Sequence, residues 1–96
     1  MRQITADAAR AFNNNQTFKR SNTEVRKNEF GAIELRLHGN AIAYKNEEGM
    51  FISNGGWSSV TTKERLNGLS GVSVVQKDWE WFLNGEEWGG QWIKVN

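Results

Sequence analysis

The sequence predicts an α+β fold, with one domain over residues 1–96 that holds a mostly antiparallel sheet of about five to six strands and two short helices. Three observations support this prediction. Residues 32–37 alternate strictly between apolar and polar side chains, Asn84-Gly85 is a strong hairpin signal, and 96 residues suffice for one hydrophobic core but not for two. The eleven aromatic residues, five of them Trp, supply large apolar surfaces from which such a core can be built.

The first predicted element is a short helix over residues 4–14. Thr5 is a suitable N-cap, and the asparagines at 13–15 end the helix because their side chains compete for backbone hydrogen bonds. The residues that share its apolar face are Ala8, Ala11 and Phe12. This narrow stripe favours packing against a sheet.

Residues 17–27 are polar and basic, and we expect an exposed loop that leads into an edge strand at Thr23–Arg26. Charges on an edge strand prevent unwanted pairing with other chains, which is one explanation of the basic character. The other is a binding role for the four basic residues, Lys19, Arg20, Arg26 and Lys27.

An antiparallel meander follows. Residues 32–37 form its first strand, His38-Gly39-Asn40 supply a tight turn, and residues 41–45 and 50–53 form the next two strands.

The segment 55–69 specifies its geometry at almost every position. Glycines turn the chain into Trp57, and Thr61 and Glu64 have the spacing of a capping box that starts a helix over about residues 62–67. Three side chains have no structural assignment here, and we expect them to face outward as contact residues: Trp57, Lys63 and Arg65.

The last third of the chain predicts three more strands, at residues 72–77, 79–83 and 91–95. The alternation in the second of them indicates a core face made by Trp79, Trp81 and Leu83. Of the remaining tryptophans we expect Trp88 to serve as a surface anchor.

Four blocks resemble a family of small proteins encoded widely in bacteriophage genomes: residues 21–25, residues 37–43, Gly56-Trp57 through Thr61-Thr62-Lys63-Glu64-Arg65-Leu66-Asn67, and residues 81–85 with Trp88 and Trp92. The likeness covers most of the chain. It implies a phage origin and a role inside infected bacteria, and it carries over no catalytic residues.

Little in the sequence favours catalysis. There is no cysteine, and the one histidine, His38, lies in a predicted turn. No glycine pair has phosphate-loop spacing, and no apolar run approaches the roughly 18 residues of a membrane span. We therefore expect no enzymatic activity, no cofactor, no metal and no membrane insertion, and a cytoplasmic setting in the infected host.

We hypothesise a phage accessory protein that binds a host or defence protein and modulates it. Such binding needs a rigid scaffold with aromatic and Arg anchors rather than an active site. The alternative is nucleic-acid binding through a basic edge and exposed tryptophans, and self-association as a homodimer is a further option. The candidate binding residues are Lys19, Arg20, Arg26, Lys27, Trp57, Lys63, Arg65 and Trp88.

Overall fold

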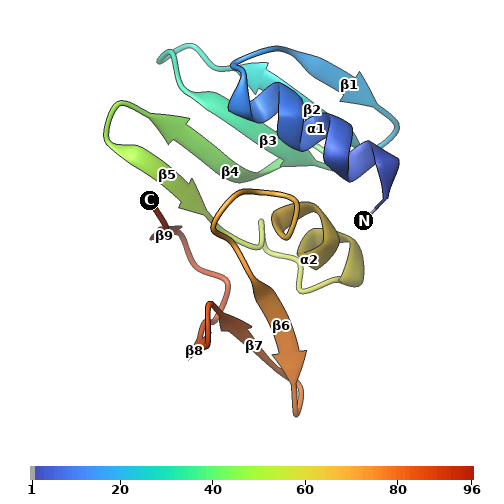
Figure 1. Ribbon diagram of the computed structural model, residues 1–96, viewed down its shortest axis with the longest axis vertical. Coiled ribbons are helices and arrows are strands. Elements are labelled where there is room, and N and C mark those ends of the chain that lie inside the picture. The colour runs from blue at the N-terminus through green and yellow to red at the C-terminus, as the bar shows by residue number, and fades with distance from the viewer. Residues whose placement is uncertain (1) are drawn as a thin grey trace.

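Two antiparallel sheets and two helices make up the fold, which a computed structural model describes over residues 2–96 (Figure 1). The larger sheet has the order β1-β2-β3-β4-β5-β9, with bounds Phe18–Arg20, Thr23–Lys27, Ile33–Leu37, Asn40–Asn46, Gly49–Ile52 and Ile93–Lys94. The smaller has the order β6-β7-β8, with bounds Val74–Lys77, Glu80–Leu83 and Glu86–Glu87. The helices are α1, Gln3–Asn13, and α2, Val60–Leu66. The predicted α+β class is confirmed.

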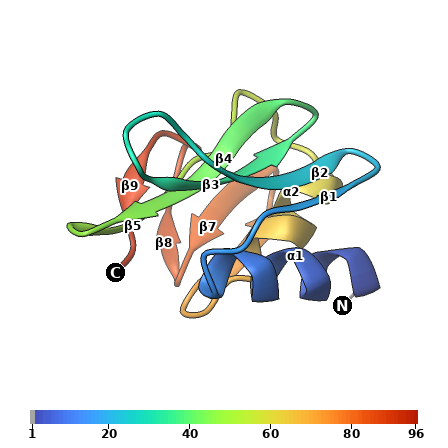
Figure 2. The ribbon, with the colours of Figure 1, turned by 90° about the horizontal axis from the view of Figure 1, so that it is seen from above.

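Helix α1 lies across one face of the six-stranded sheet, over β1, β2 and β3, and leaves the opposite face open (Figure 2). The alternation predicted for β3 accounts for this arrangement. Ile33, Leu35 and Leu37 are buried on the helix side, whereas Glu34 and Arg36 are partly exposed on the other. We call this sheet with α1 and α2 the body.

A β-bulge between β3 and β4 adds apolar volume to the core. The register shifts between Leu35, which pairs with Ala43, and Arg36, which pairs with Ala41. The extra residue, Ile42, is therefore unpaired, and both Ile42 and Ala43 are fully buried although they are neighbours in sequence.

The three-stranded sheet, which we call the finger, extends from the body at the end away from α1 (Figure 1). Its first hairpin joins Lys77 to Glu80 through Asp78 and Trp79, which both have positive φ, at 52° and 71°. These angles define a type I′ turn, in which the second residue is usually glycine. The second hairpin turns at Asn84-Gly85, as predicted.

One part of the predicted core is wrong. Trp81 and Leu83 are buried, but Trp79 is 92% exposed. The two-residue turn ends before Glu80, so Trp79 belongs to the tip of the hairpin and not to the alternating strand.

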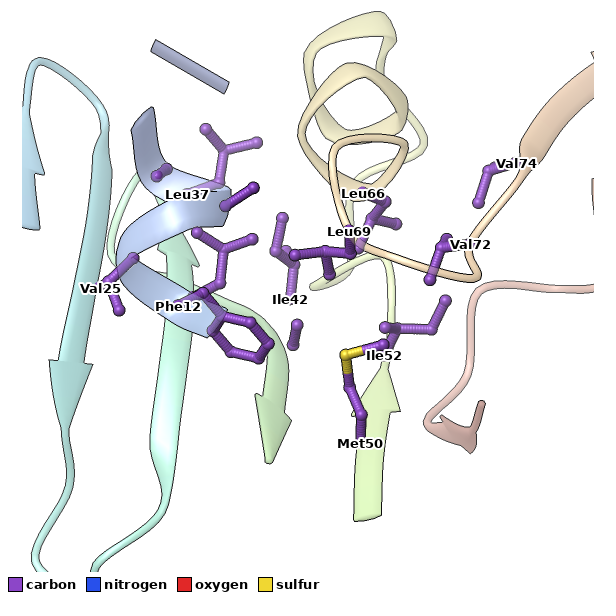
Figure 3. Close-up of a cluster of buried hydrophobic side chains, with 14 of the residues drawn as sticks. Phe12, Val25, Leu37, Ile42, Met50, Ile52, Leu66, Leu69, Val72 and Val74 are labelled. Atoms are coloured by element: carbon purple, nitrogen blue, oxygen red, sulfur yellow. The ribbon is translucent and has the colours of Figure 1, made fainter. Parts of the chain in front are cut away.

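A single hydrophobic core connects body and finger. Leu66 of α2 and Leu69 after it lie between the sheet residue Ile42 and the finger residue Val74 (Figure 3). The same cluster contains Phe12 of α1. The base of the finger is thus held by core packing, while its tip is not.

Two local expectations at the helix starts need correction. Helix α1 begins at Gln3, so Thr5 lies inside the helix, where it is buried and does not cap. Helix α2 is capped by Ser59, whose Oγ accepts a hydrogen bond from the backbone N–H of Thr62 at 3.1 Å. The predicted capping box of Thr61 and Glu64 is therefore wrong. Ser58, Ser59, Thr61 and Thr62 are all able to cap a helix, and Ser59 does so two residues before Thr61.

The expected loop and edge strand at residues 17–27 are also corrected. Residues 18–20 form the short strand β1, which pairs with β2 and takes the edge position. Strand β2 then lies between β1 and β3, inside the sheet.

Candidate interaction surface

Arg65 does not face outward as expected, since it is only 3% exposed. Its Nε donates to Thr23 Oγ1 at 2.9 Å, and its Nη1 donates to Thr5 Oγ1 at 2.8 Å and to Glu64 Oε1 at 3.1 Å. The hydroxyl of Thr5 also donates to Glu64. Burial lowers the pKa of Arg65, and the neighbouring Glu64 carboxylate opposes that shift. Arg65 therefore joins α1, β2 and α2 and is not available to a partner.

Trp88 is not a surface anchor either, because it is 4% exposed. Its ring lies 6.0 Å from that of Trp81, and its Nε1 donates to the carbonyl oxygen of Gln91 at 2.8 Å. The indole is thus part of the core with its one donor satisfied.

The four basic residues of positions 19–27 are exposed, but the sheet divides them between its faces. Arg20 lies beside Thr23, on the side of α1, and makes an ion pair with Asp7 at 2.9 Å. Lys27 pairs in register with Ile33 and has the same orientation. Lys19 and Arg26 lie on the open face opposite Glu24 and Glu34. No single basic face results.

Lys63 is half-buried on α2 and contacts the finger. Its Nζ donates to Gln76 Oε1 at 2.7 Å and lies 5.8 Å from the centre of the Trp81 ring. Lys63 thus links α2 to the finger, and Trp81 takes part in a cation–π contact.

Trp57 is exposed, as expected, at 65%. It borders a hollow of about 160 Å³ between the β3–β4 turn and the start of α2. The residues that line this hollow include His38, Asn40, Ile42, Gly55, Trp57, Ser59 and Thr61.

A larger groove of about 460 Å³ runs along the finger. Its lining consists of Ser58, Gln76, Trp79, Glu80, Trp81, Glu87, Trp88 and Gly89. Ser58 lies in this groove, whereas its neighbours Trp57 and Ser59 line the smaller hollow. The two hollows therefore adjoin across residues 57–59, with Trp57 on one side and Trp79 on the other. We call this region the tryptophan surface.

A second aromatic group lies on the open face of the body. Tyr44 stacks on Phe51 with ring centres 4.8 Å apart, and the ring of Trp92 lies 5.1 Å from that of Tyr44. Trp92 is 47% exposed. On the same face Glu34 forms an ion pair with Arg36 at 2.9 Å.

The sequence predicted the exposure of Trp57 correctly, but it placed Trp79 on the core face of a strand. A usable signal is present, because Asp78-Trp79 separates two β-prone runs by two residues, as Asn84-Gly85 does. The signal is weak, since an aromatic residue replaces the glycine that a type I′ turn favours.

Two further observations concern the chemistry of residues 2–96. No group of three or more His, Cys, Asp or Glu side chains among them is placed to hold a metal ion. None of their helices is long and apolar enough to cross a membrane.

The fold and surface define a small α+β protein with two adjoining hollows bordered by exposed tryptophans. The sequence model of the Kyanoviridae Gp96 protein family matches residues 1–95, and the chain belongs to this family of phage proteins. The phage affiliation that the sequence suggested is confirmed at this level. No curated protein matches the chain, and no solved structure matches it.

Proposed function

We propose that the protein acts by binding a host or defence protein through the tryptophan surface. One observation carries this proposal. Two exposed tryptophans border adjoining hollows, Trp57 the smaller one and Trp79 the larger one. Tryptophan is enriched among residues that dominate the energy of protein interfaces, and such residues cluster near the centre of the interface in well-packed pockets. The core holds the base of the finger, including Trp81 and Trp88 below the groove, and a preformed base reduces the entropic cost of association.

Affinity capture of the tagged protein from infected bacteria tests the proposal. A partner should co-purify in stoichiometric amount with the wild-type chain and survive nuclease treatment. Trp57→Ala should lose at least about 1 kcal/mol of binding free energy if Trp57 is an anchor. The matched control is Phe30→Ala, because Phe30 is also a large exposed side chain but lies in the turn before β3. Equal capture by both variants contradicts the proposal.

Nucleic-acid binding is a second proposal, on a different basis from the basic edge that the sequence suggested. The open face of the body presents Trp92 and Tyr44 in a form on which unpaired bases can stack. Arg26 and Arg36 lie on this face, but Glu34 is next to both, which weakens its attraction for phosphate. Capture of nuclease-sensitive material would support this second proposal if the binding weakens steeply with salt concentration and is lost in Trp92→Ala.

A further inference from the structure

The smaller hollow, beside Trp57, has no carboxylate, ammonium or guanidinium group in its lining. All of its lining residues lie within the described range 2–96, and none of them is Asp, Glu, Lys or Arg. Leu37 and Ile42, which also belong to the core, are buried and form its floor (Figure 3). The exposed residues His38, Asn40 and Trp57 form its rim. The hollow therefore offers no carboxylate, Lys or Arg to pair with a charged ligand.

Polar side chains below the rim are already hydrogen-bonded within the protein. Asn54 Oδ1 accepts from the backbone N–H of Gly56 at 2.8 Å, and its Nδ2 donates to Ser58 Oγ at 3.2 Å. Ser59 Oγ and Thr62 Oγ1 are hydrogen-bonded to each other at 2.9 Å. Because a buried water needs about two to four polar partners, water in this hollow is poorly held. Replacing such water with an apolar group favours binding.

The size of the hollow restricts what can occupy it. Its volume of about 160 Å³ is below the roughly 300–1,000 Å³ of sites for cofactors and other small molecules. It is close to the roughly 150 Å³ of an apolar cavity that holds one benzene molecule. The hollow therefore suits a single apolar side chain and is too small for a nucleotide or a cofactor.

The turn that carries Trp57 rests directly on the floor of the hollow. A Cβ atom at Gly55 would lie 3.0 Å from Cγ2 of Ile42, so a larger residue would press on the core there. The backbone N–H of Trp57 donates to the carbonyl oxygen of Asn54 at 3.0 Å, and Ser59 caps α2 beside it. Hydrogen bonds of the turn and of the helix cap thus preform the hollow, which lowers the entropic cost of binding.

We infer that the hollow beside Trp57 binds an uncharged apolar side chain, about the size of leucine, on the protein partner. The side chain displaces the poorly held water, and the indole of Trp57 packs against it. A charged side chain would lose its hydration there and find no carboxylate, Lys or Arg in the lining. The inference rests on the proposed function, since it names the chemistry that the partner presents to one part of the tryptophan surface.

Titration of the full chain with short peptides, followed by NMR of backbone amides and indole N–H groups, tests the inference. The probe is a capped Gly-Ser-Leu-Ser-Gly peptide, and the control peptide carries asparagine, which is close to leucine in shape but polar. The leucine peptide should shift the signals of Gly55, Trp57, Ser59 and Thr61, and the asparagine peptide should not. Equal shifts with both peptides, shifts confined to other residues, or no shift at the highest soluble concentration of the leucine peptide would overturn the inference.

Matched variants locate the site. Thr61→Leu adds apolar volume in the lining of the hollow and should abolish the shifts at the same peptide concentration. The control, Val60→Leu, enlarges the neighbouring side chain, which is 75% exposed and outside the lining, and should change nothing. Trp57→Ala removes part of the rim at an exposed position, so it should also abolish the shifts without a folding defect. Shifts that persist in both Thr61→Leu and Trp57→Ala contradict the assignment.

The two proposals fail in different ways. If a protein partner is captured and depends on Trp57 but binds Thr61→Leu as well as wild type, binding through the tryptophan surface stands and the assignment of the hollow fails. If no partner is captured but the leucine peptide binds the hollow, the proposed function fails and the chemistry of the hollow stands.

Discussion

The body and the finger each hold one side chain in an environment unusual for its type. In the body a charged residue, Arg65, is buried and surrounded by hydrogen-bond partners. In the finger a large apolar residue, Trp79, is almost fully exposed. Strands β2 to β5 have a strand on each side, whereas β6 and β8 are both edges of a three-stranded sheet. Arg65 and Trp79 are therefore exceptions to the usual preference of their residue types, and each is explained by its place in the fold.

This difference indicates a division of roles. The body provides a rigid support, because its helices and central strands meet in a core that contains Phe12, Leu35 and Ile52 at 1% exposure or less. The finger has a packed base and a tip with a strained, exposed tryptophan. Strained backbone conformations cluster at functional sites, and the one at Trp79 lies on the part of the finger that the core does not cover.

The largest expected effect tests the role of Arg65 in the body. Arg65→Ala should lower the free energy of unfolding by about 3–5 kcal/mol, because it leaves Glu64 without its cation and Thr5 and Thr23 without a shared donor. Urea denaturation measures this. Lys63→Ala, two residues earlier on the same helix, is the control and should cost less than about 1 kcal/mol. Similar losses in both variants would contradict the distinction.

A second pair compares a central strand with the finger. Leu35→Ala should cost about 2–5 kcal/mol, since Leu35 is fully buried on β3. Val75→Ala should stay within about 0.5 kcal/mol, because Val75 is an exposed residue of β6. Thermal unfolding of the two variants measures the difference. A large loss in Val75→Ala would show that the outer face of the finger is packed in solution.

A smaller effect of opposite sign is expected at the tip. Trp79→Gly should raise the free energy of unfolding by up to about 1 kcal/mol, because glycine adopts positive φ without strain. Trp79→Ala keeps the unfavourable angle and should change it by no more than about 0.5 kcal/mol. Denaturation midpoints of the two variants provide the comparison. Destabilisation by glycine would mean that the indole is packed.

The smallest expected effect concerns the open face of the body and its pH dependence. Burial alone would raise the pKa of Glu34, but hydrogen bonds from Asn28 and Arg36 and the charges of Arg36 and Arg26 hold it below its ordinary value. A carboxyl group with a lowered folded-state pKa stabilises the fold above its unfolded pKa, and this contribution is lost as pH falls through the folded value. Glu34→Gln should therefore cost less than about 1 kcal/mol at pH 7.

The difference between wild type and Glu34→Gln should shrink as the pH falls from neutral through the lowered pKa of Glu34 in the folded protein. Urea midpoints at pH 7 and pH 3.5 measure it. If the urea midpoints of wild type and Glu34→Gln differ equally at both pH values, the loss of stability in the variant is due to packing and not to charge.

The sequence predicted the regular parts of this fold because each has a local cause. The alternation of Ile33, Leu35 and Leu37 specifies a half-buried strand, and Asn84-Gly85 specifies a two-residue turn. The exposure of Trp57 also follows locally, from the turn formed by the two glycines before it.

The wrong assignments depend on contacts between distant segments. Arg65 faces inward because Thr5 and Thr23, which lie 60 and 42 residues away, provide acceptors that no local pattern reveals. Trp88 is buried because the adjacent strand presents Trp81. The basic residues of β1 and β2 separate because strand pairing sends them to opposite faces. Trp79 was assigned to a strand because tryptophan is unusual at the second position of a two-residue turn, although the turn at Asp78-Trp79 has the usual length.

The three partners that Arg65 connects also bear on the order of folding. The guanidinium can reach Thr5 and Thr23 only after α1, β2 and α2 have assembled, and its bond to Thr5 joins residues that are 60 positions apart. Interactions that form after the folding transition state slow unfolding without accelerating folding. If the hydrogen bonds of Arg65 belong to this class, Arg65→Ala should increase the unfolding rate and leave the folding rate nearly unchanged.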